Sequence, residues 1–137
     1  MAQPFPSAAW LQVFEGILNS DEQYARIAKN WEGDIMFMIE PDKDSQDEPV
    51  YYYMDLWHGE CRSTRILEPD EAKGSKPAFI LRASRSEFIR VLDGKLDPMQ
   101  AMMTRRLRVD GNLAYMLRNI PTVLDFVRCA REVGIEE

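Results

Sequence analysis

The stretch from Gly94 to Leu117 constrains the fold most strongly, because its residue types predict three short elements in quick succession. Asp97 is a good helix N-cap, and Pro98 suits the first helical position, where its missing N–H would have no partner anyway. The sequence therefore predicts a short helix that begins at Pro98 and continues through Met103.

A strand and a second helix are predicted directly after this helix. Leu107 and Val109 alternate with charged residues, which is the pattern of a half-buried strand. Gly111 breaks the strand, and Asn112 can cap the next helix. The apolar face of that helix is made of Leu113, Met116, Leu117 and Ile120. We expect the three elements to present methionine and leucine side chains to a common interior.

The order of turn residues and apolar residues in this stretch resembles the sterol carrier protein family of sterol-binding, lipid-transfer domains. The matching residues are Asp97, Pro98, Ala101, Met102, Leu107, Arg108, Val109, Gly111, Asn112, Leu113, Ala114 and Leu117. Two positions depart from the family pattern, because Met102 replaces the usual aromatic residue and Arg105 stands where glycine is usual. If that glycine serves a positive φ angle, Arg105 is strained or the turn is built differently.

Composition places the chain among ordinary globular proteins and argues against two classes of partner. The 137 residues are 45% hydrophobic and 29% charged, which suits one domain over residues 1–137. A net charge of -6 argues against nonspecific nucleic-acid binding, which needs cations that neutralise phosphates. The same charge gives no general attraction to anionic membranes.

Targeting and redox signals are absent from the sequence. Cys61 and Cys129 are too few for a disulfide framework, so both are expected as free thiols. The N-terminus has no basic region followed by an apolar core, as a signal peptide would. No run approaches the ~18 apolar residues of a membrane span, so stable membrane insertion is not expected. A cytoplasmic location is the resulting expectation.

Helical spacing dominates the N-terminal quarter of the chain. Ser7 can cap a helix whose apolar face is formed by Trp10, Leu11, Phe14, Ile17 and Leu18. A capping box at residues 20–23 restarts or kinks this helix, and Gly33 is expected to end it.

Four strand patterns precede the stretch described first. Residues 35–39 are apolar on both faces and predict a central strand, while 50–57 and 60–67 predict a hairpin around His58-Gly59. The intervening loop 41–49 holds Asp42, Asp44, Asp47 and Glu48. These four lack the spacing and the glycine of a calcium loop, so we expect a solvated loop and no metal site.

The remaining segments complete the predicted set. A loop is expected through Pro69, Gly74 and Pro77, followed by a strand at 78–83. Ser84 can cap a helix that ends at Gly94, and an amphipathic helix follows Pro121.

Together these elements predict an α+β fold with a five-stranded, mainly antiparallel sheet covered by helices on one face. The family resemblance implies the same architecture and adds an apolar tunnel between the sheet and the helices.

Sites for catalysis or for a cofactor are not indicated. His58 is the only histidine and lies close in sequence to Glu60 and Cys61, but its position is typical of a turn residue. A Cys-His nucleophile pair would need a hydrogen bond and a third orienting group. No spacing typical of a zinc site, a phosphate-binding loop or a serine nucleophile elbow occurs. The chain is therefore predicted to be neither an enzyme nor a holder of a cofactor or metal.

The cationic and methionine-rich parts of the Gly94–Leu117 stretch each allow two interpretations. Arg105, Arg106 and Arg108 are expected to form a solvated face, or alternatively to contact a ligand headgroup at a tunnel mouth. Helical methionines usually fill a core, yet methionine also suits promiscuous apolar ligand surfaces. The family resemblance favours a ligand cavity lined by Met99, Met102, Met103, Leu113, Met116, Leu117, Leu124 and Val127.

The predicted function is non-catalytic binding, and transfer, of a hydrophobic ligand such as a fatty acid, an acyl-CoA or a sterol. One alternative is an enzyme, or an accessory subunit, that holds a hydrophobic substrate in the same cavity. Another is a protein-interaction module that uses Tyr51-Tyr52-Tyr53 as an exposed strand edge. The sequence identifies neither the lipid nor a protein partner.

Overall fold

A computed structural model describes residues 2–136 and confirms the predicted α+β class. These residues form seven helices and five strands. The helices are α1 (Ala8–Ser20), α2 (Glu22–Ile27), α3 (Pro69–Gly74), α4 (Arg85–Leu92), α5 (Pro98–Met103), α6 (Leu113–Arg118) and α7 (Ile120–Val133). The strands are β1 (Ile35–Glu40), β2 (Val50–Trp57), β3 (Glu60–Leu67), β4 (Phe79–Ser84) and β5 (Arg108–Gly111).

The strands form one sheet in the order β3-β2-β1-β4-β5. The β1–β2, β2–β3 and β4–β5 pairs are antiparallel, whereas β4 lies parallel to β1. The sheet is therefore mainly antiparallel. The predicted tyrosine edge is wrong, because β2 is hydrogen-bonded on both sides.

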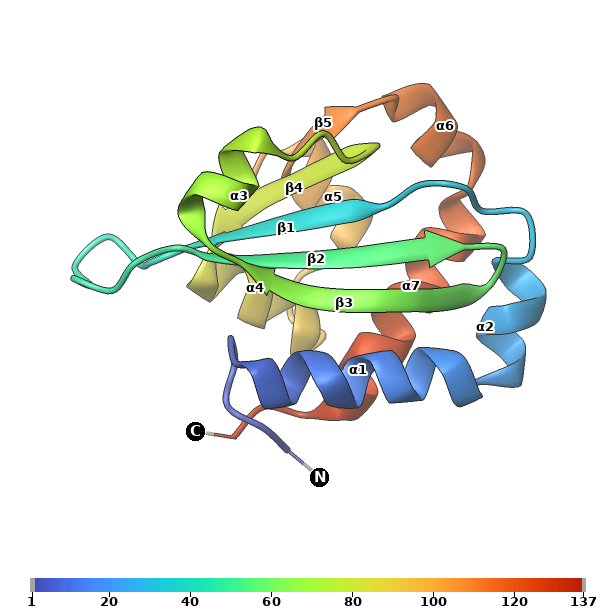
Figure 1. Cartoon of the computed structure of the whole chain (residues 1–137), viewed down its shortest axis with the longest axis horizontal. Coiled ribbons are helices and arrows are strands. Elements are labelled where there is room, and N and C mark those ends of the chain that lie inside the picture. Colours follow the sequence, from blue (N-terminus) through green and yellow to red (C-terminus); the bar gives the residue numbers. More distant parts are fainter. Residues whose placement is uncertain (1, 137) are drawn as a thin grey trace.

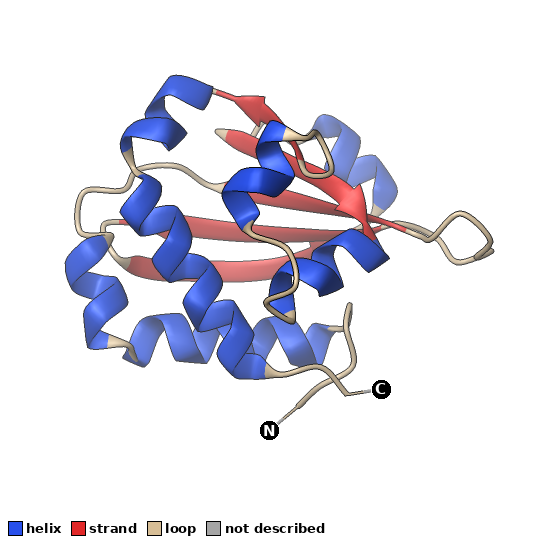
Figure 2. Cartoon of the chain, turned by 180° about the vertical axis from the view of Figure 1, so that it is seen from behind, coloured by secondary structure: helices blue, strands red, loops and turns tan. Residues whose placement is uncertain are grey.

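Helices α4 to α7 lie against one face of the sheet, and α1 runs beside β3 (Figures 1 and 2). Side chains of a strand alternate between faces, so Ile35, Phe37 and Ile39 meet these helices and contribute to the main core. Met36 and Met38 lie in a second, smaller cluster. This arrangement explains why β1 is apolar on both faces.

Helix α3 is the main difference from the predicted fold, in which residues 69–77 form a loop and all helices share one face. Glu68 and Glu71 form a reciprocal capping box, and Pro69 occupies the first turn. Ala72 of this helix joins the second cluster with Met36, so α3 covers part of the opposite sheet face. A helix of six residues is too short for its periodicity to reveal it in the sequence.

The junction between α1 and α2 also differs from the sequence-based boundary. The Ser20 hydroxyl donates to the Gly16 carbonyl, while the Asp21 carboxylate caps α2 by accepting from the backbone N–H of Tyr24. The cap is therefore Asp21. Helix α2 ends at Ile27, six residues before the predicted end at Gly33.

Two turns have backbone conformations that L-residues rarely adopt. His58 and Gly59 have φ angles of 51° and 83°, which confirms the predicted hairpin turn. A Cβ atom at Gly59 would lie 2.7 Å from the Ala25 carbonyl oxygen, so this position requires glycine. Arg105, which follows α5, has a φ angle of 61°. It therefore adopts the conformation that suits the glycine expected there, at a cost of about 1–2 kcal/mol.

Candidate functional site

An apolar cavity of about 90 Å³ lies between the sheet and the helices. The sheet contributes Ile35, Phe37, Ile39, Tyr52, Met54, Leu56 and Leu81 to its wall. Helices and connecting segments contribute Phe5, Trp10, Phe14, Tyr24, Trp31, Phe88, Val91, Leu92, Pro98, Met102, Leu107, Met116, Thr122, Val123, Phe126, Val127 and Ala130. Elements from the whole length of the chain therefore enclose one apolar volume.

Most polar groups of the wall are bonded to the backbone. The Tyr52 hydroxyl donates to the Ser7 carbonyl at 2.7 Å, and the Trp31 indole N–H donates to the Gly33 carbonyl at 2.9 Å. The Thr122 hydroxyl donates to the Ile27 carbonyl at 3.3 Å. Burial raises the pKa of Tyr52, so this hydroxyl stays neutral. The indole N–H of Trp10, by contrast, has no hydrogen-bond partner.

The wall is least buried where α4, α5 and α7 meet. Leu92, Met102, Val123 and Val127 are half-buried, whereas Trp10, Met54 and Leu56 are almost fully enclosed. Helices α5 and α7 lie over the same sheet face (Figure 2). The cavity thus approaches the surface at the α5–α7 side and is closed at the α1 side.

The sequence-predicted cavity residues divide into three groups. Met102, Met116 and Val127 lie in the wall. Met99 is half-buried outside it. The side chains of the other four are exposed, with exposed fractions of 82% for Met103, 48% for Leu113, 48% for Leu117 and 42% for Leu124. These four were expected to point inward, and the structure has them pointing outward. Contact of any of the eight residues with a ligand stays a prediction.

The burial of individual positions in the two helices shows this division. In α6, Met116 is buried, whereas Leu113 and Leu117, which are four residues apart and neighbours on the helix surface, are both exposed. In α7, Asp125 and Cys129 are buried against α2 together with the apolar residues. The buried stripe is therefore rotated away from Leu124. The spacing of apolar residues in a sequence cannot predict the burial of a polar residue such as Asp125.

Sequence reasoning missed the aromatic part of the wall. Trp10 and Phe14 belong to the predicted apolar face of the first helix, and Tyr52 occupies an alternating strand position. The signals for burial were therefore present. Assignment of these residues to a cavity, as opposed to packed core, requires the three-dimensional arrangement.

The three arginines proposed for headgroup contact lie outside the cavity wall. Arg108 forms an ion pair with Glu40 at 2.8 Å. Arg105 and Arg106 are exposed and have no ion-pair partner within residues 2–136. Their role as headgroup contacts stays a prediction.

His58 and Cys61 do not form a nucleophile pair in the structure. The His58 Nε2 atom lies 2.6 Å from a carboxylate oxygen of Glu32, and both side chains are about half exposed. The Cys61 thiol is buried and donates to the Ser63 carbonyl. Burial raises the pKa of Cys61 to about 12, so the thiolate is disfavoured.

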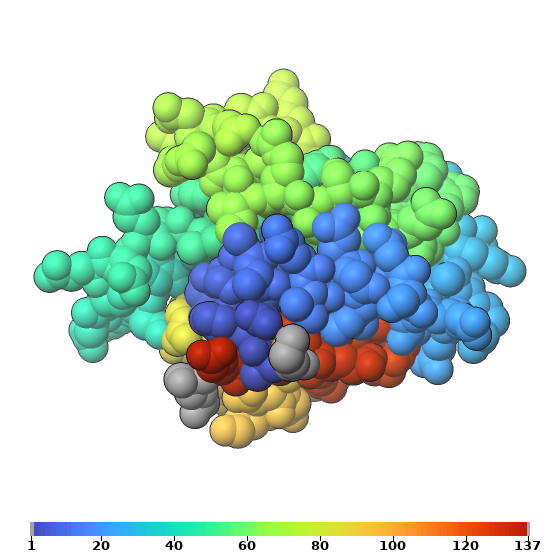
Figure 3. Space-filling model, turned by 60° about the horizontal axis from the view of Figure 1, so that its bottom comes forward, coloured from blue at the N-terminus to red at the C-terminus, as the bar shows by residue number. Residues whose placement is uncertain are grey.

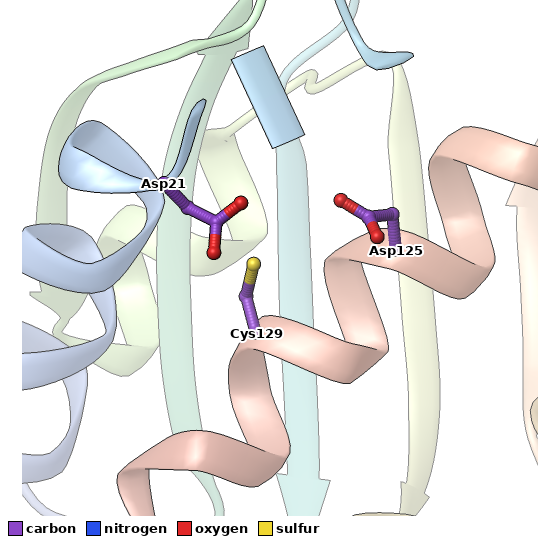
Figure 4. Close-up of side chains that lie close together, drawn as sticks. All are labelled: Asp21, Asp125 and Cys129. Carbon is purple, nitrogen blue, oxygen red and sulfur yellow. The ribbon is translucent and has the colours of Figure 1, made fainter. Parts of the chain in front are cut away.

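A polar cluster joins the start of α2 to α7. Ligand-type atoms of Asp21, Asp125 and Cys129 lie within 4.8 Å of one another, and Figure 4 shows the three side chains converging. Arg128 donates to Asp21 and to Asp125, each at 2.7 Å, and Gln23 donates to Asp125 at 2.8 Å. The Arg128 guanidinium lowers the pKa of Asp21. Because this cation already binds both carboxylates, the cluster acts as an ion-pair network between α2 and α7.

Comparison with known proteins gives a consistent result. The sequence matches the SCP-2 sterol transfer family over residues 14–123. No curated protein matches the chain. A crystal structure of sterol carrier protein 2 is 31% identical, with a TM-score of 0.83, and the alignment covers 93% of this chain and 98% of that one.

Two further solved structures resemble the chain. A conserved hypothetical protein from Thermus thermophilus is 30% identical with a TM-score of 0.82, covering 95% of this chain and 90% of that one. A ubiquinone synthesis protein, UbiJ-SCP2, is 13% identical with a TM-score of 0.54 and shares the fold alone, over 95% and 94% of the two chains. None of the helices in residues 2–136 combines the length and apolar character that crossing a bilayer requires. The cytoplasmic location expected from the sequence stays a prediction.

Proposed function

Because the chain belongs to the SCP-2 sterol transfer family, we propose that it binds a lipid or similar hydrophobic ligand in the cavity between sheet and helices, without catalysing a reaction. The observation that carries this proposal is the wall itself. Apart from Thr122, its side chains are apolar or aromatic, and the sheet and the helix layer enclose the cavity from both sides. Transfer of apolar surface from water into this space would supply the binding energy.

The cavity must widen to take a long-chain ligand. Its volume of about 90 Å³ is below the roughly 300–1,000 Å³ that is typical of ligand pockets. Met102 and Met116 can change shape at low cost because their side chains are unbranched and flexible. The half-buried wall between α5 and α7 is where we expect the widening.

Hydrophobic transfer supplies enough free energy for useful affinity. Each buried methylene contributes ~0.8 kcal/mol, so a chain of twelve would contribute roughly 10 kcal/mol before association costs. Those costs are at least ~4 kcal/mol, and micromolar affinity corresponds to about 8 kcal/mol. The net contribution is then at most ~6 kcal/mol, so a long acyl or alkyl chain of this length supplies a dissociation constant of roughly tens of micromolar at best.

The composition of the wall favours binding over chemistry at this site. Among residues 2–136, the wall includes no Asp, Glu, His, Lys, Arg or Cys, which are the usual sources of acid–base or nucleophilic catalysis. An accessory role, in which the chain presents its ligand to a separate enzyme, is compatible with the same cavity.

Native mass spectrometry tests the proposal directly. The protein purified under mild conditions should carry a lipid-sized adduct, and delipidated protein should regain it from a lipid mixture. Trp10 and Trp31 lie in the wall, so their fluorescence should also change on titration with a long-chain ligand. The absence of both a lipid adduct and a saturable fluorescence change would contradict the proposal. Chemical conversion of the bound lipid by the protein would contradict its non-catalytic part.

A further inference from the structure

Residues 97–107, which contain α5, are held to the rest of the protein by apolar contacts and by their two chain connections. Within residues 2–136, every hydrogen bond of this segment joins two of its own members, such as the Leu107 N–H and the Ala101 carbonyl at 3.0 Å. None of its charged side chains forms an ion pair in that range. The attachment therefore comes from buried side chains, which are Pro98, Ala101 and Leu107.

Helix α7, on the other side of the more open part of the cavity wall, is attached differently. The Arg128 guanidinium donates to the Asp21 carboxylate at 2.7 Å, which fixes α7 to the start of α2. The Arg131 guanidinium donates to the Val91 carbonyl at 3.0 Å, which fixes α7 to α4. Movement of α7 would break these bonds, and bonds with a charged donor are stronger than neutral ones.

Helix α1 is also anchored, on the closed side of the cavity, where it lies between β3 and α7 (Figure 3). The Asn19 side-chain amide donates to the Cys61 carbonyl at 2.9 Å and accepts from the Cys61 N–H at 2.8 Å. The other helices that border the cavity, α2, α4 and α6, each have a hydrogen bond to a distant part of the chain. Among the helices of residues 2–136 that border the cavity, α5 alone has no such bond.

We propose that residues 97–107 form the lid of the cavity, and that a hydrophobic ligand enters and leaves between this lid and α7. This inference rests on the function proposed above. Pro98, Met102 and Leu107 belong to the cavity wall, so outward movement of the segment would open the wall. Met102 is half-buried, as are Val123 and Val127 across the gap on α7.

The two ends of the lid are fixed, so the movement is confined to the segment between them. The Leu96 N–H donates to the Arg90 carbonyl of α4, which holds the chain immediately before the lid. Arg108 begins β5 and pairs with Arg82 of β4, which holds the chain immediately after it. The lid can move with its internal hydrogen bonds intact, so the cost of opening is the exposure of a few apolar side chains. Segments that open for ligands are generally drawn from such weakly held parts of a fold.

Two matched alanine substitutions test the lid. Ala101 in α5 and Ala72 in α3 hold the same position in a six-residue helix that begins with proline, and their exposed fractions are 1% and 6%. Ala101→Gly removes a methyl group that is buried only while the lid is closed, so opening becomes easier. Stopped-flow tryptophan fluorescence should show this variant binding dodecan-1-ol about two- to fivefold faster than the unmodified protein does. Ala72→Gly makes the same change on the opposite face of the sheet and should leave the binding rate unchanged.

Hydrogen exchange of the unmodified protein is the second measurement, and it decides if a variant folds poorly. Relative to their intrinsic rates, the hydrogen-bonded amides of residues 97–107 should exchange together and roughly tenfold faster than those of residues 125–131 in α7. Similar exchange rates in the two segments would overturn the lid, and so would equal binding rates for the two variants. If the unmodified protein still binds dodecan-1-ol saturably, the proposed function survives that result. The absence of saturable binding by the unmodified protein would contradict the proposed function, and the lid with it.

Discussion

Replacement of Met116 by tryptophan should block the cavity while leaving the fold intact. Met116 is 2% exposed and lies in the wall, where α6 faces the cavity space. An indole is several heavy atoms larger than the methionine side chain, and the available space is only about 90 Å³. The added ring should therefore occupy most of the cavity volume that is present before a ligand binds.

The expected size of the effect follows from the lost burial. Exclusion of two methylene groups from the cavity removes ~1.6 kcal/mol of binding free energy, which is a little more than tenfold in affinity. Stability should fall by less than ~1 kcal/mol, because the ring enters existing space. In a fully packed core, the same change would cost about 1–3 kcal/mol.

Thermal melting and ligand titration of the same variant measure both quantities. Leu117→Trp is the control, because Leu117 is the next residue of α6 and is 48% exposed. It should change neither the melting temperature nor the affinity by a large amount. A Met116→Trp protein that melts several degrees lower and binds with unchanged affinity per folded molecule would refute the reasoning. Met116 would then be core filling, and the ligand would lie elsewhere.

Three further predictions concern the surface and the α2–α7 network. Arg105→Gly should stabilise the protein by about 0.5–1 kcal/mol, measured by urea unfolding, because glycine adopts the positive φ at this position without strain; unchanged stability would mean that the turn stores no strain. If Arg106 contacts an anionic headgroup, Arg106→Gln should weaken fatty-acid binding by about 1.5–3 kcal/mol and leave the affinity for a long-chain alcohol unchanged. Arg108, which is already paired with Glu40, is the control position. Equal losses of affinity for both ligands would exclude headgroup contact. Arg128 lowers the pKa of Asp21, so the stabilisation from this pair is present above about pH 4 and is lost as the pH falls through the lower folded-state pKa. Asp21→Asn keeps the N-cap but removes the charge, so it should lower the free energy of unfolding by about 1.5 kcal/mol at pH 7 and reduce the further loss of stability below pH 4. An unchanged dependence of the melting temperature on acid pH would contradict this role.

Much of the fold could be predicted because local signals agree with the tertiary structure. The caps of four helices, at Ser7, Ser84, Asp97 and Asn112, all accept the backbone hydrogen bond that such residues provide. The hairpin at His58-Gly59 and the two-sided burial of β1 follow equally local rules. Helix α3 could not be predicted because six residues are too few to show a helical period, and the boundary at Asp21 could not be predicted because Ser20 is an equally suitable cap next to it.

The site was harder to predict than the fold. The face of α7 that turns inward carries the network around Asp125 and Arg128, and this network joins residues that are about a hundred positions apart in the sequence. The sequence contains those residues without indicating their pairing. For the same reason, the unpaired donor of Trp10 could not be foreseen. An indole that lacks an acceptor is recognised only when every neighbouring carbonyl has been placed.

The parallel pairing of β1 with β4 has a consequence for the order in which the chain folds. The β2–β3 hairpin closes a two-residue turn, whereas Ile35 meets Phe79 only after the intervening 43 residues have been gathered. Loop-closure entropy favours the short contacts first, so the hairpins should assemble early and β4 should dock late. The cavity wall requires α4 to α7, which follow β4 in the chain. Ligand binding would then be among the last properties that a refolding molecule recovers. Its recovery would report the completion of folding, at a time when secondary-structure signals have already reached their final value.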